Sequence, residues 1–195
     1  MSDTPLTTEQ ILEKAEDVLR RYGPAKATVV DVARALQISH GSVYRHFPSK
    51  AALRDAVTRR WLERISTPLA AIAARHVPAL ERLRDWLHLL IHAKRHLAQE
   101  DPELFASYVK LSAEAREVIG EHVTTLVDQL SQIIADGVQE GVFETLSIPA
   151  TARAVFDATA RFHNPVHVQE WSDPTIDTAY ANVWTLILRG LTPHT

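Results

Sequence analysis

Apolar positions repeat at intervals of three and four residues along almost the whole 195-residue chain, which is the spacing of one face of an α-helix. Alternation typical of a strand never lasts more than a few residues. Prolines near helix starts and glycines near helix ends divide the pattern. It predicts an all-α fold of about nine helices, with a kink or restart at Pro68, over roughly residues 8–22, 28–36, 41–47, 50–65, 78–98, 102–112, 115–140, 149–163 and 174–190.

The first three predicted helices are short, and their apolar positions fit one small core that the start of the fourth helix completes. The members of this core are Ile11, Ala15, Val18, Leu19, Val32, Ala33, Leu36, Ile38, Val43, Phe47 and Leu53. The sequence therefore predicts a compact domain over residues 1–50 and a larger helical domain over residues 51–195.

The third predicted helix gives only Val43 and Phe47 to that core, and its other side chains are polar. A helix of about six residues is too short to be stable alone. Two short helices separated by a tight turn are the arrangement that places a second helix in the major groove of DNA. The polar outer face of this helix favours a DNA partner over plain solvent exposure.

Composition and charge limit the classes of protein to which the chain can belong. The formal net charge is −3, but residues 1–64 carry +3 and residues 65–195 carry −6, so the basic end coincides with the predicted helix-turn-helix. The absence of cysteine excludes disulfides, thiolate zinc sites and cysteine nucleophiles. Met1–Pro5 show no signal-peptide pattern, and no run of about 18 apolar residues occurs, so we expect a cytoplasmic protein without a membrane span.

A family resemblance rests on the same region. Its residues are Thr28, then Asp31-Val-Ala, then Ile38-Ser39-x-Gly41-Ser42-Val43-Tyr44-x-His46-Phe47-x-Ser49-Lys50-x-x-Leu53. This pattern resembles the N-terminal signature of the TetR family of transcriptional regulators over about residues 8–54. Residues 24–27, Pro-Ala-Lys-Ala, depart from the signature, because family members usually carry an aromatic residue and a second threonine there. The departure concerns the packing of the first two helices, not the fold.

Ten residues are candidates for contact with DNA: Lys26, Thr28, Ser39, His40, Gly41, Ser42, Tyr44, Arg45, His46 and Lys50. Three of them, His40, Ser42 and Arg45, lie near the N-terminal end of the third helix, where side chains reach base edges. Gly41 has no side chain, so the backbone there can approach the sugar-phosphate wall closely.

The remaining candidates are suited to contact the phosphate groups of DNA. Tyr44 and His46 can donate to phosphate oxygens. The backbone amides at the helix start beside Thr28 form an anion site, and Lys50 and Lys26 add positive charge.

The TetR resemblance implies a homodimer, usually a repressor that binds a palindromic operator and releases it when a ligand enters the C-terminal domain. Half-sites of a two-fold reader lie about 34–36 Å apart. The resemblance also implies that the last two helices form the dimer interface, and both carry apolar faces. The predicted interface residues are Val155, Phe162, Tyr180, Trp184, Ile187 and Leu191. The alternative is that these faces pack on the chain's own core.

Seven of the ten histidines lie between His76 and His167. His88, His92 and His96 have the four-residue spacing of metal ligands, but they share an arc of the helix with charged residues. That arc is typical of a solvated face, so we do not expect the three histidines to hold a metal.

His122 and His163 lie within or beside apolar helix faces, and His167 follows closely, so the three can converge. Three interpretations stay open: histidines satisfied in the core, the wall of an organic-ligand pocket, or a site for a divalent metal such as zinc or nickel at His122, His163 and His167. The predicted effector pocket comprises Trp86, Phe105, Tyr108, His122, Leu126, Phe156 and His163.

No enzyme chemistry is expected, because the sequence lacks paired Glu-x-x-His motifs, a glycine-rich phosphate loop and a nucleophile elbow. The sequence predicts a DNA-binding regulator, in the form of a ligand-released repressor. The alternatives are a regulator without a ligand and a metal-responsive regulator that uses the histidines of the larger domain. A small-molecule effector is expected, with a divalent metal as the second choice and no certain cofactor.

Overall fold

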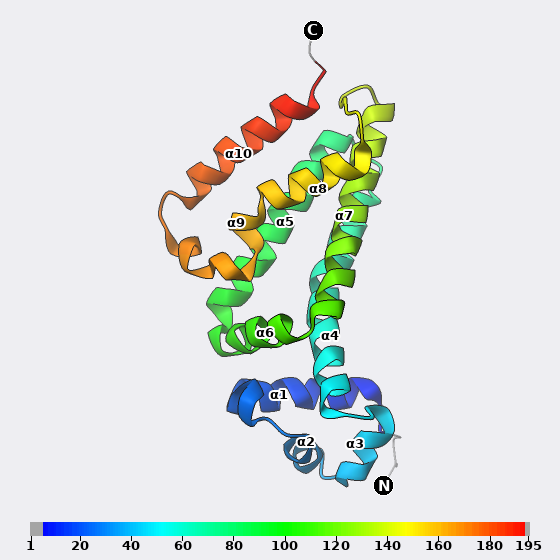
Figure 1. Cartoon of the computed structure of the whole chain (residues 1–195), viewed down its shortest axis with the longest axis vertical. Helices are drawn as coiled ribbons and strands as arrows, with labels where there is room; N and C mark the ends of the chain where they lie inside the picture. Colours follow the sequence, from blue (N-terminus) through cyan, green and yellow to red (C-terminus); the bar gives the residue numbers. More distant parts are fainter. Residues whose placement is uncertain (1–5, 194–195) are drawn as a thin grey trace. The chain divides into compact units, whose positions relative to one another are not determined.

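The computed structural model describes residues 6–193, which form ten α-helices and one 3-10 helix, with no strand in that range (Figure 1). Met1–Pro5, on which the absence of a signal peptide was predicted, lie outside the described residues. Across residues 6–193, no helix has both the length and the apolar character needed to cross a bilayer. The elements are α1 Thr8–Lys26, α2 Val29–Ala35, α3 His40–His46, α4 Lys50–Ala73, α5 Ala79–Glu100, α6 Pro102–Glu114, α7 Arg116–Gln139, α8 Ile148–Ala158, α9 Ala160–His163, η1 Pro165–Ser172 and α10 Ile176–Leu191.

The all-α prediction is confirmed, and the differences from the predicted helices are local. The expected restart at Pro68 is wrong, because α4 runs through this residue to Ala73. The helix predicted over 149–163 is divided at Thr159, whose hydroxyl donates to the carbonyls of Val155 and Phe156 within the same chain segment. The short helix η1, after α9, was not predicted.

The chain divides into two compact units. The first holds the described residues up to Glu63 together with Asp101–Ile119, and the second holds Arg64–Glu100 and the described residues from Gly120 onward. This division differs from the predicted boundary after residue 50. The first half of α4 supplies buried Leu53, Val57 and Trp61 to the first unit.

Helix α6 belongs to the first unit because it packs on α1. Ser107 donates to the carbonyl of Leu19 at 3.3 Å, and Arg20 pairs with Asp101 at 2.8 Å. Helix α1 breaks at Gly23, whose φ of +68° suits glycine, and one further turn follows. These contacts fix the end of α1, from which the chain enters α2.

Arg54 on α4 joins three parts of the first unit. Its guanidinium donates to the carbonyl of Pro24 and to Glu114 at 2.9 Å, so it connects α4 with the end of α1 and with α6. Nine of the eleven residues predicted for the small core are buried, and the other two, Leu36 and Ile38, are half-buried. The core that supports α2 and α3 is therefore the predicted one.

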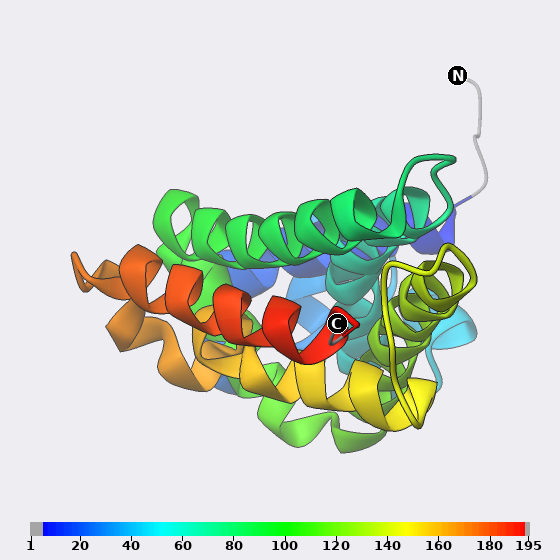
Figure 2. The same cartoon turned by 90° about the horizontal axis from the view of Figure 1, so that it is seen from above.

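The second unit is a bundle of the latter half of α4 with α5, α7, α8 and α10 around a core that includes Trp86, Leu90 and Ile133. Trp86 Nε1 donates to Gln129 at 2.9 Å, and Gln129 donates to the Ser66 carbonyl at 3.2 Å, which joins α5, α7 and α4. Figure 2 shows α10 (red) beside α5 (green) and α8 (yellow). The apolar face of α10 therefore has a partner within its own chain.

Candidate nucleic-acid interface

Helices α2 and α3 are joined by a turn that only four residues span. Its backbone is closed by hydrogen bonds from Gln37 N to the Arg34 carbonyl and from Ile38 N to the Ala33 carbonyl. Gln37 has a φ of +57°, the left-handed conformation that reverses the chain before Ser39 caps α3. This is the geometry of a helix-turn-helix.

Two apolar side chains hold α3 against the small core: Val43 and Phe47 are buried. The predicted division of the helix is confirmed, because the polar side chains on its other side are exposed or half-buried. They are Ser39, His40, Ser42, Tyr44, Arg45 and His46. The core thus decides which face of α3 is turned outward.

A chain of hydrogen bonds orders the outer face at the start of α3. The Ser39 hydroxyl accepts from Ser42 N at 3.2 Å, and the two serine hydroxyls lie 2.9 Å apart. Arg45 Nη2 donates to Ser42 Oγ at 3.1 Å. His40 and Tyr44 meet edge to face with ring centroids 6.3 Å apart. The exposed guanidinium and hydroxyls are consequently held together on one surface.

Gly41 lies in the first turn of α3, where the fold does not require a glycine. A Cβ at this position would meet only Ser39 Oγ, at an ordinary 3.8 Å, and its φ is not in the left-handed region. Packing within the chain therefore does not require glycine here. Close approach of an external backbone is the remaining physical reason for a residue without a side chain.

The anion site predicted at the first backbone amides of α2 stays a prediction, and Thr28 itself caps that helix. Its backbone N–H and its hydroxyl both donate to the Asp31 carboxylate, at 3.1 and 2.6 Å. Hydrogen bonds from Thr28 and the nearby Arg34 lower the pKa of Asp31, so the carboxylate stays charged. A negative group already occupies the donors of Thr28 itself.

The remaining basic candidates lie on other elements of the first unit or at the end of α3. Lys26 is exposed at the end of α1, and Lys50 is half-buried at the start of α4. His46 Nδ1 lies 3.3 Å from Thr8 Oγ1, within hydrogen-bonding distance. Sequence reasoning missed Arg34, an exposed guanidinium in the last turn of α2, although a basic residue at that place in the motif was the available signal.

The predicted effector residues do not come together in one unit. Phe105 and Tyr108 are buried in the first unit, with ring centroids 5.8 Å apart, and Tyr108 also packs on Trp61. The others belong to the second unit, and three of them are members of its apolar core: Trp86, Leu126 and Phe156. The predicted effector residues are therefore divided between the two units, and their pocket stays a prediction.

His163 and His122 are the remaining predicted pocket residues. Burial and the nearby Lys94 lower the pKa of His163 to about 4, and burial, Lys94 and His163 lower that of His122 to about 3. His163 Nε2 lies 3.4 Å from both the Thr159 hydroxyl and the Phe156 carbonyl. His163 thus fits the interpretation of a core histidine with local partners.

The predicted three-histidine metal site is not formed. His167 lies 2.7 Å from Glu170 and pairs with it. Among residues 6–193, no group of three His, Cys, Asp or Glu side chains is placed to hold a metal ion.

Acid is expected to destabilise the second unit through His163. Its folded pKa of about 4 lies below the ordinary value of 6.5, so the unfolded chain binds the proton more readily. The stabilisation is complete above about pH 6.5 and is lost as the pH falls toward about 4, by about 2 kcal/mol at roughly pH 5. Denaturant unfolding across this range measures the slope. His163→Phe removes one of two such titrations and reduces the slope, and the rest remains because burial also lowers the pKa of His122, to about 3. The exposed-site control His92→Asn keeps the full slope; equal slopes in both variants would contradict the assignment.

The chain itself buries most of the surface of three predicted dimer residues: Val155, Phe162 and Leu191 are 4%, 1% and 2% exposed. The prediction is wrong for Phe162, which packs with Ile91 and Ile176 in the interior of the second unit. Tyr180 and Trp184 are half-buried and pack on the core from α10. An open apolar groove lies along α8 and α10, and the predicted Val155, Ile187 and Leu191 line it together with Ala154, Ala158 and Gly190; Leu186 beside them is 68% exposed. Dimerisation through this face stays a prediction.

A helix-turn-helix with a polar, ordered outer face is characteristic of one class of DNA-binding proteins. Residues 11–57 match the profile of the bacterial regulatory proteins of the tetR family, and residues 79–184 match the tetracyclin repressor-like C-terminal domain. The chain belongs to the TetR family of transcriptional regulators, which are not enzymes.

Curated relatives share part of the sequence. The chain is 33% identical over 113 residues to the HTH-type transcriptional repressor Rv1474c of Mycobacterium tuberculosis, which covers 54% of this chain and 58% of that protein. It is 30% identical over 84 residues to the nucleoid occlusion factor SlmA of Vibrio campbellii, which covers 43% of each. The chain thus spans less than two thirds of the length of these relatives.

Solved structures share the fold over the whole chain. SmeT, the repressor of the multidrug efflux pump SmeDEF of Stenotrophomonas maltophilia, is 19% identical with a TM-score of 0.71, over 98% of this chain and 93% of SmeT. FadR of Bacillus subtilis, solved with stearoyl-CoA, is 19% identical with a TM-score of 0.68, over 94% and 99%. At these identities the likeness concerns the fold alone.

Proposed function

We propose that this DNA-binding regulator is a homodimeric repressor that binds a palindromic operator through α3 and releases it when a small ligand binds. The observation that carries the DNA-binding part is the outer face of α3, where Arg45, Ser42 and Ser39 form one hydrogen-bonded, exposed row beside Gly41. Arginine is the side chain that most often reads guanine in the major groove, and serine reads several bases.

Repression and ligand release are supported by the relatives. The name of the Mycobacterium tuberculosis relative describes a repressor, and SmeT, also a repressor, has been solved in complex with triclosan. The second unit of this chain has the size and the helical architecture to carry an effector site.

The proposed dimer forms through the apolar groove along α8 and α10. Small residues on α8 and Gly190 on α10 allow the close approach of a second copy, and Leu186 offers a large apolar side chain that the chain itself does not cover. A two-fold interface uses the same patch on both copies, so each Leu186 enters the groove of the partner.

Leu186→Asp is expected to shift the equilibrium toward monomers by about 2 kcal/mol, roughly 30-fold in the dissociation constant, because two uncompensated carboxylates enter one interface. Light scattering over a dilution series measures the shift. The matched control is Leu80→Asp, at a similarly apolar but separate exposed site on α5, which leaves the mass unchanged. An unchanged dimer with Leu186→Asp would refute this face.

The DNA-binding proposal is tested by selection from a pool of random duplexes with the purified protein. We expect enrichment of a two-fold-symmetric site whose affinity falls steeply as salt is added, because phosphate contacts release counterions. A pool that stays random after repeated rounds would overturn the proposal. An enriched site without two-fold symmetry would overturn the homodimer alone.

A further inference from the structure

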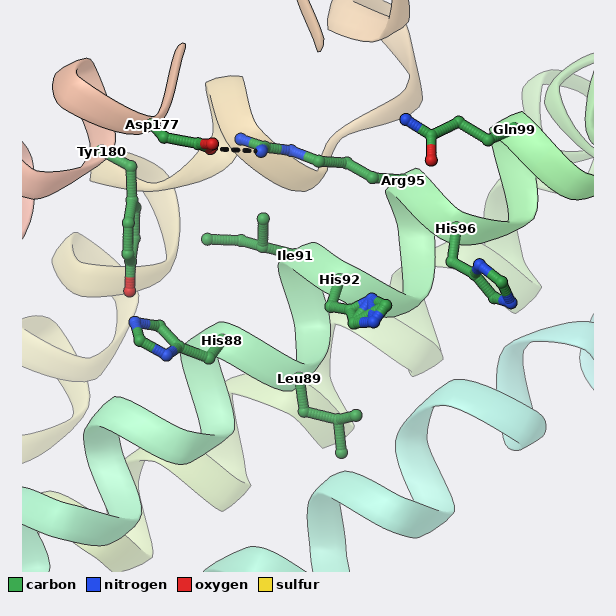
Figure 3. Close-up of a pocket in the computed structure, with 9 residues that line it drawn as sticks. All are labelled: His88, Leu89, Ile91, His92, Arg95, His96, Gln99, Asp177 and Tyr180. Carbon is green, nitrogen blue, oxygen red and sulfur yellow. Dashed lines mark hydrogen bonds and ion pairs between the residues drawn. The ribbon is translucent and has the colours of Figure 1, made fainter.

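An open groove of about 640 Å³ lies between α5 and α10 in the second unit, away from every residue of the predicted effector pocket (Figure 3). His88, His92 and His96 stand one helical turn apart along α5, with their imidazoles exposed. Tyr180 and Asp177 extend from α10 toward this side of α5. The volume is that of a site for a small organic molecule.

Arg95 is the most unusual group in this groove. Its side chain is only 16% exposed, whereas its partner Asp177 is 85% exposed. Arg95 Nη1 donates to Asp177 at 2.7 Å, but Nε and Nη2 are buried without a hydrogen-bond partner among the described residues. A buried guanidinium normally satisfies its donors, and unmet donors on a cation are costly. One edge of Arg95 therefore lacks an acceptor.

Tyr180 adds a second unmet donor. Its hydroxyl is buried without a partner in the described part of the chain, and burial raises its pKa to about 12, so it keeps its proton. The ring meets His88 and Phe162 edge to face, with centroids 5.6 and 5.3 Å apart. These contacts hold the hydroxyl at the α5 side of the groove (Figure 3).

The lining as a whole carries unmet donors on Arg95 and Tyr180. Among the nine described residues that line it, Asp177 is the one acidic side chain, and it already serves Arg95. Leu89 and Ile91 supply apolar surface on opposite sides of the histidine row (Figure 3). The complementary ligand has a flat pair of acceptor oxygens, a negative charge and an apolar body.

We propose that this groove binds a small organic carboxylate, which accepts two parallel hydrogen bonds from Nε and Nη2 of Arg95. A guanidinium edge and a carboxylate match in this bidentate geometry. The two nitrogens are out of contact with solvent in this structure, so the side chains around the guanidinium move aside when the carboxylate binds. The apolar body then lies along Ile91, on the same side of α5 as Tyr180 (Figure 3).

Ligand binding at this site can regulate DNA binding, an inference that rests on the proposed repressor function. The Arg95–Asp177 pair ties α5 to α10, and α10 carries Leu186 of the proposed dimer face. A bound carboxylate on Nε and Nη2 shares the positive charge of the guanidinium with Asp177 on Nη1 and thereby weakens this tie. Ligand binding thereby changes how α10 is held, and with it the relative placement of the two copies on DNA.

Calorimetric titration with 4-phenylbutyrate and its neutral analogue 4-phenylbutyramide tests the site on the full chain. We expect the acid to bind and the amide to bind at least about tenfold more weakly, because a charge-assisted pair is lost. Equal binding of the two compounds, or a dissociation constant above about 1 mM for the acid, would overturn the proposal.

Variants locate the binding. Arg95→Gln is expected to weaken 4-phenylbutyrate at least about tenfold, whereas the control Arg84→Gln, an exposed arginine on the same helix, leaves it unchanged. If circular dichroism shows that Arg95→Gln is unfolded, Gln99→Trp tests the site in its place. The indole fills the groove from an exposed position and is expected to block 4-phenylbutyrate. Wild-type affinity in Gln99→Trp and in any folded Arg95→Gln would place the acid elsewhere.

Operator binding with and without saturating 4-phenylbutyrate separates the two proposals. A fall in operator affinity that Gln99→Trp abolishes supports regulation through the groove. Unchanged operator affinity with intact ligand binding overturns the regulatory role and keeps the site. A protein that binds the acid but selects no DNA overturns the proposed function and leaves the carboxylate site standing.

Discussion

Arg45→Ala is expected to lower the affinity for the proposed operator by about 2–6 kcal/mol, because each copy of the proposed dimer loses about 1–3 kcal/mol. Arg45 is exposed on the outer face of α3, and its hydrogen bond to Ser42 aims the guanidinium along the first turn of the helix. Truncation removes the charge without opening the core, so the melting temperature stays unchanged. A gel-shift titration with the selected operator measures the loss.

Two further variants show what kind of contact Arg45 makes. Arg45→Lys keeps the charge but loses the two-pronged geometry, so a guanine contact predicts a large loss and relaxed preference at one base pair. A phosphate contact predicts a small loss that is uniform across sequences. The matched control is Arg189→Ala, an exposed arginine on α10, which leaves operator affinity intact. If Arg45→Ala binds the operator with wild-type affinity, α3 is not part of the DNA interface.

The first unit was largely predictable because its signals are local. The caps at Thr7 and Thr28, the Gly23-Pro24 break and the spacing of Val43 and Phe47 all act within a few residues. The cap at Thr28 is also local, since Asp31 follows three residues later. Its carboxylate completes the helix cap by accepting from the backbone N–H and the hydroxyl of Thr28.

The second unit was less predictable because periodicity shows which face is apolar but not what covers it. Val155 and Phe162 form a stripe that reads equally as a dimer face or as core, and the chain's own helices bury it. Leu186 lies outside that stripe and is exposed. Arg95 and Asp177 are 82 residues apart, so no local sequence pattern predicts the ion pair that forms between α5 and α10 in the folded chain.

Arg82→Ala is expected to lower the free energy of unfolding by about 3–5 kcal/mol, the cost of removing one member of a buried ion pair. Arg82 on α5 is 5% exposed. Its Nη1 donates to Asp136 at 2.7 Å and to the Ala73 carbonyl at the end of α4 at 2.9 Å, and Nη2 reaches Glu140 at 3.5 Å. Without it, Asp136 on α7 and Glu140 just after α7 lose their cation, and a helix-end carbonyl loses its donor.

Denaturant unfolding of Arg82→Ala beside Arg84→Ala isolates this effect, because Arg84 lies two residues away on the exposed side of α5. The control is expected to change stability by less than about 0.5 kcal/mol. Replacing both partners, Arg82→Met with Asp136→Leu, removes the uncompensated charge and recovers most of the loss, since a buried pair is often matched by apolar side chains of similar volume. A single variant as stable as the wild type, or a double variant no better than the single, would show that the guanidinium does not hold α4, α5 and α7 together.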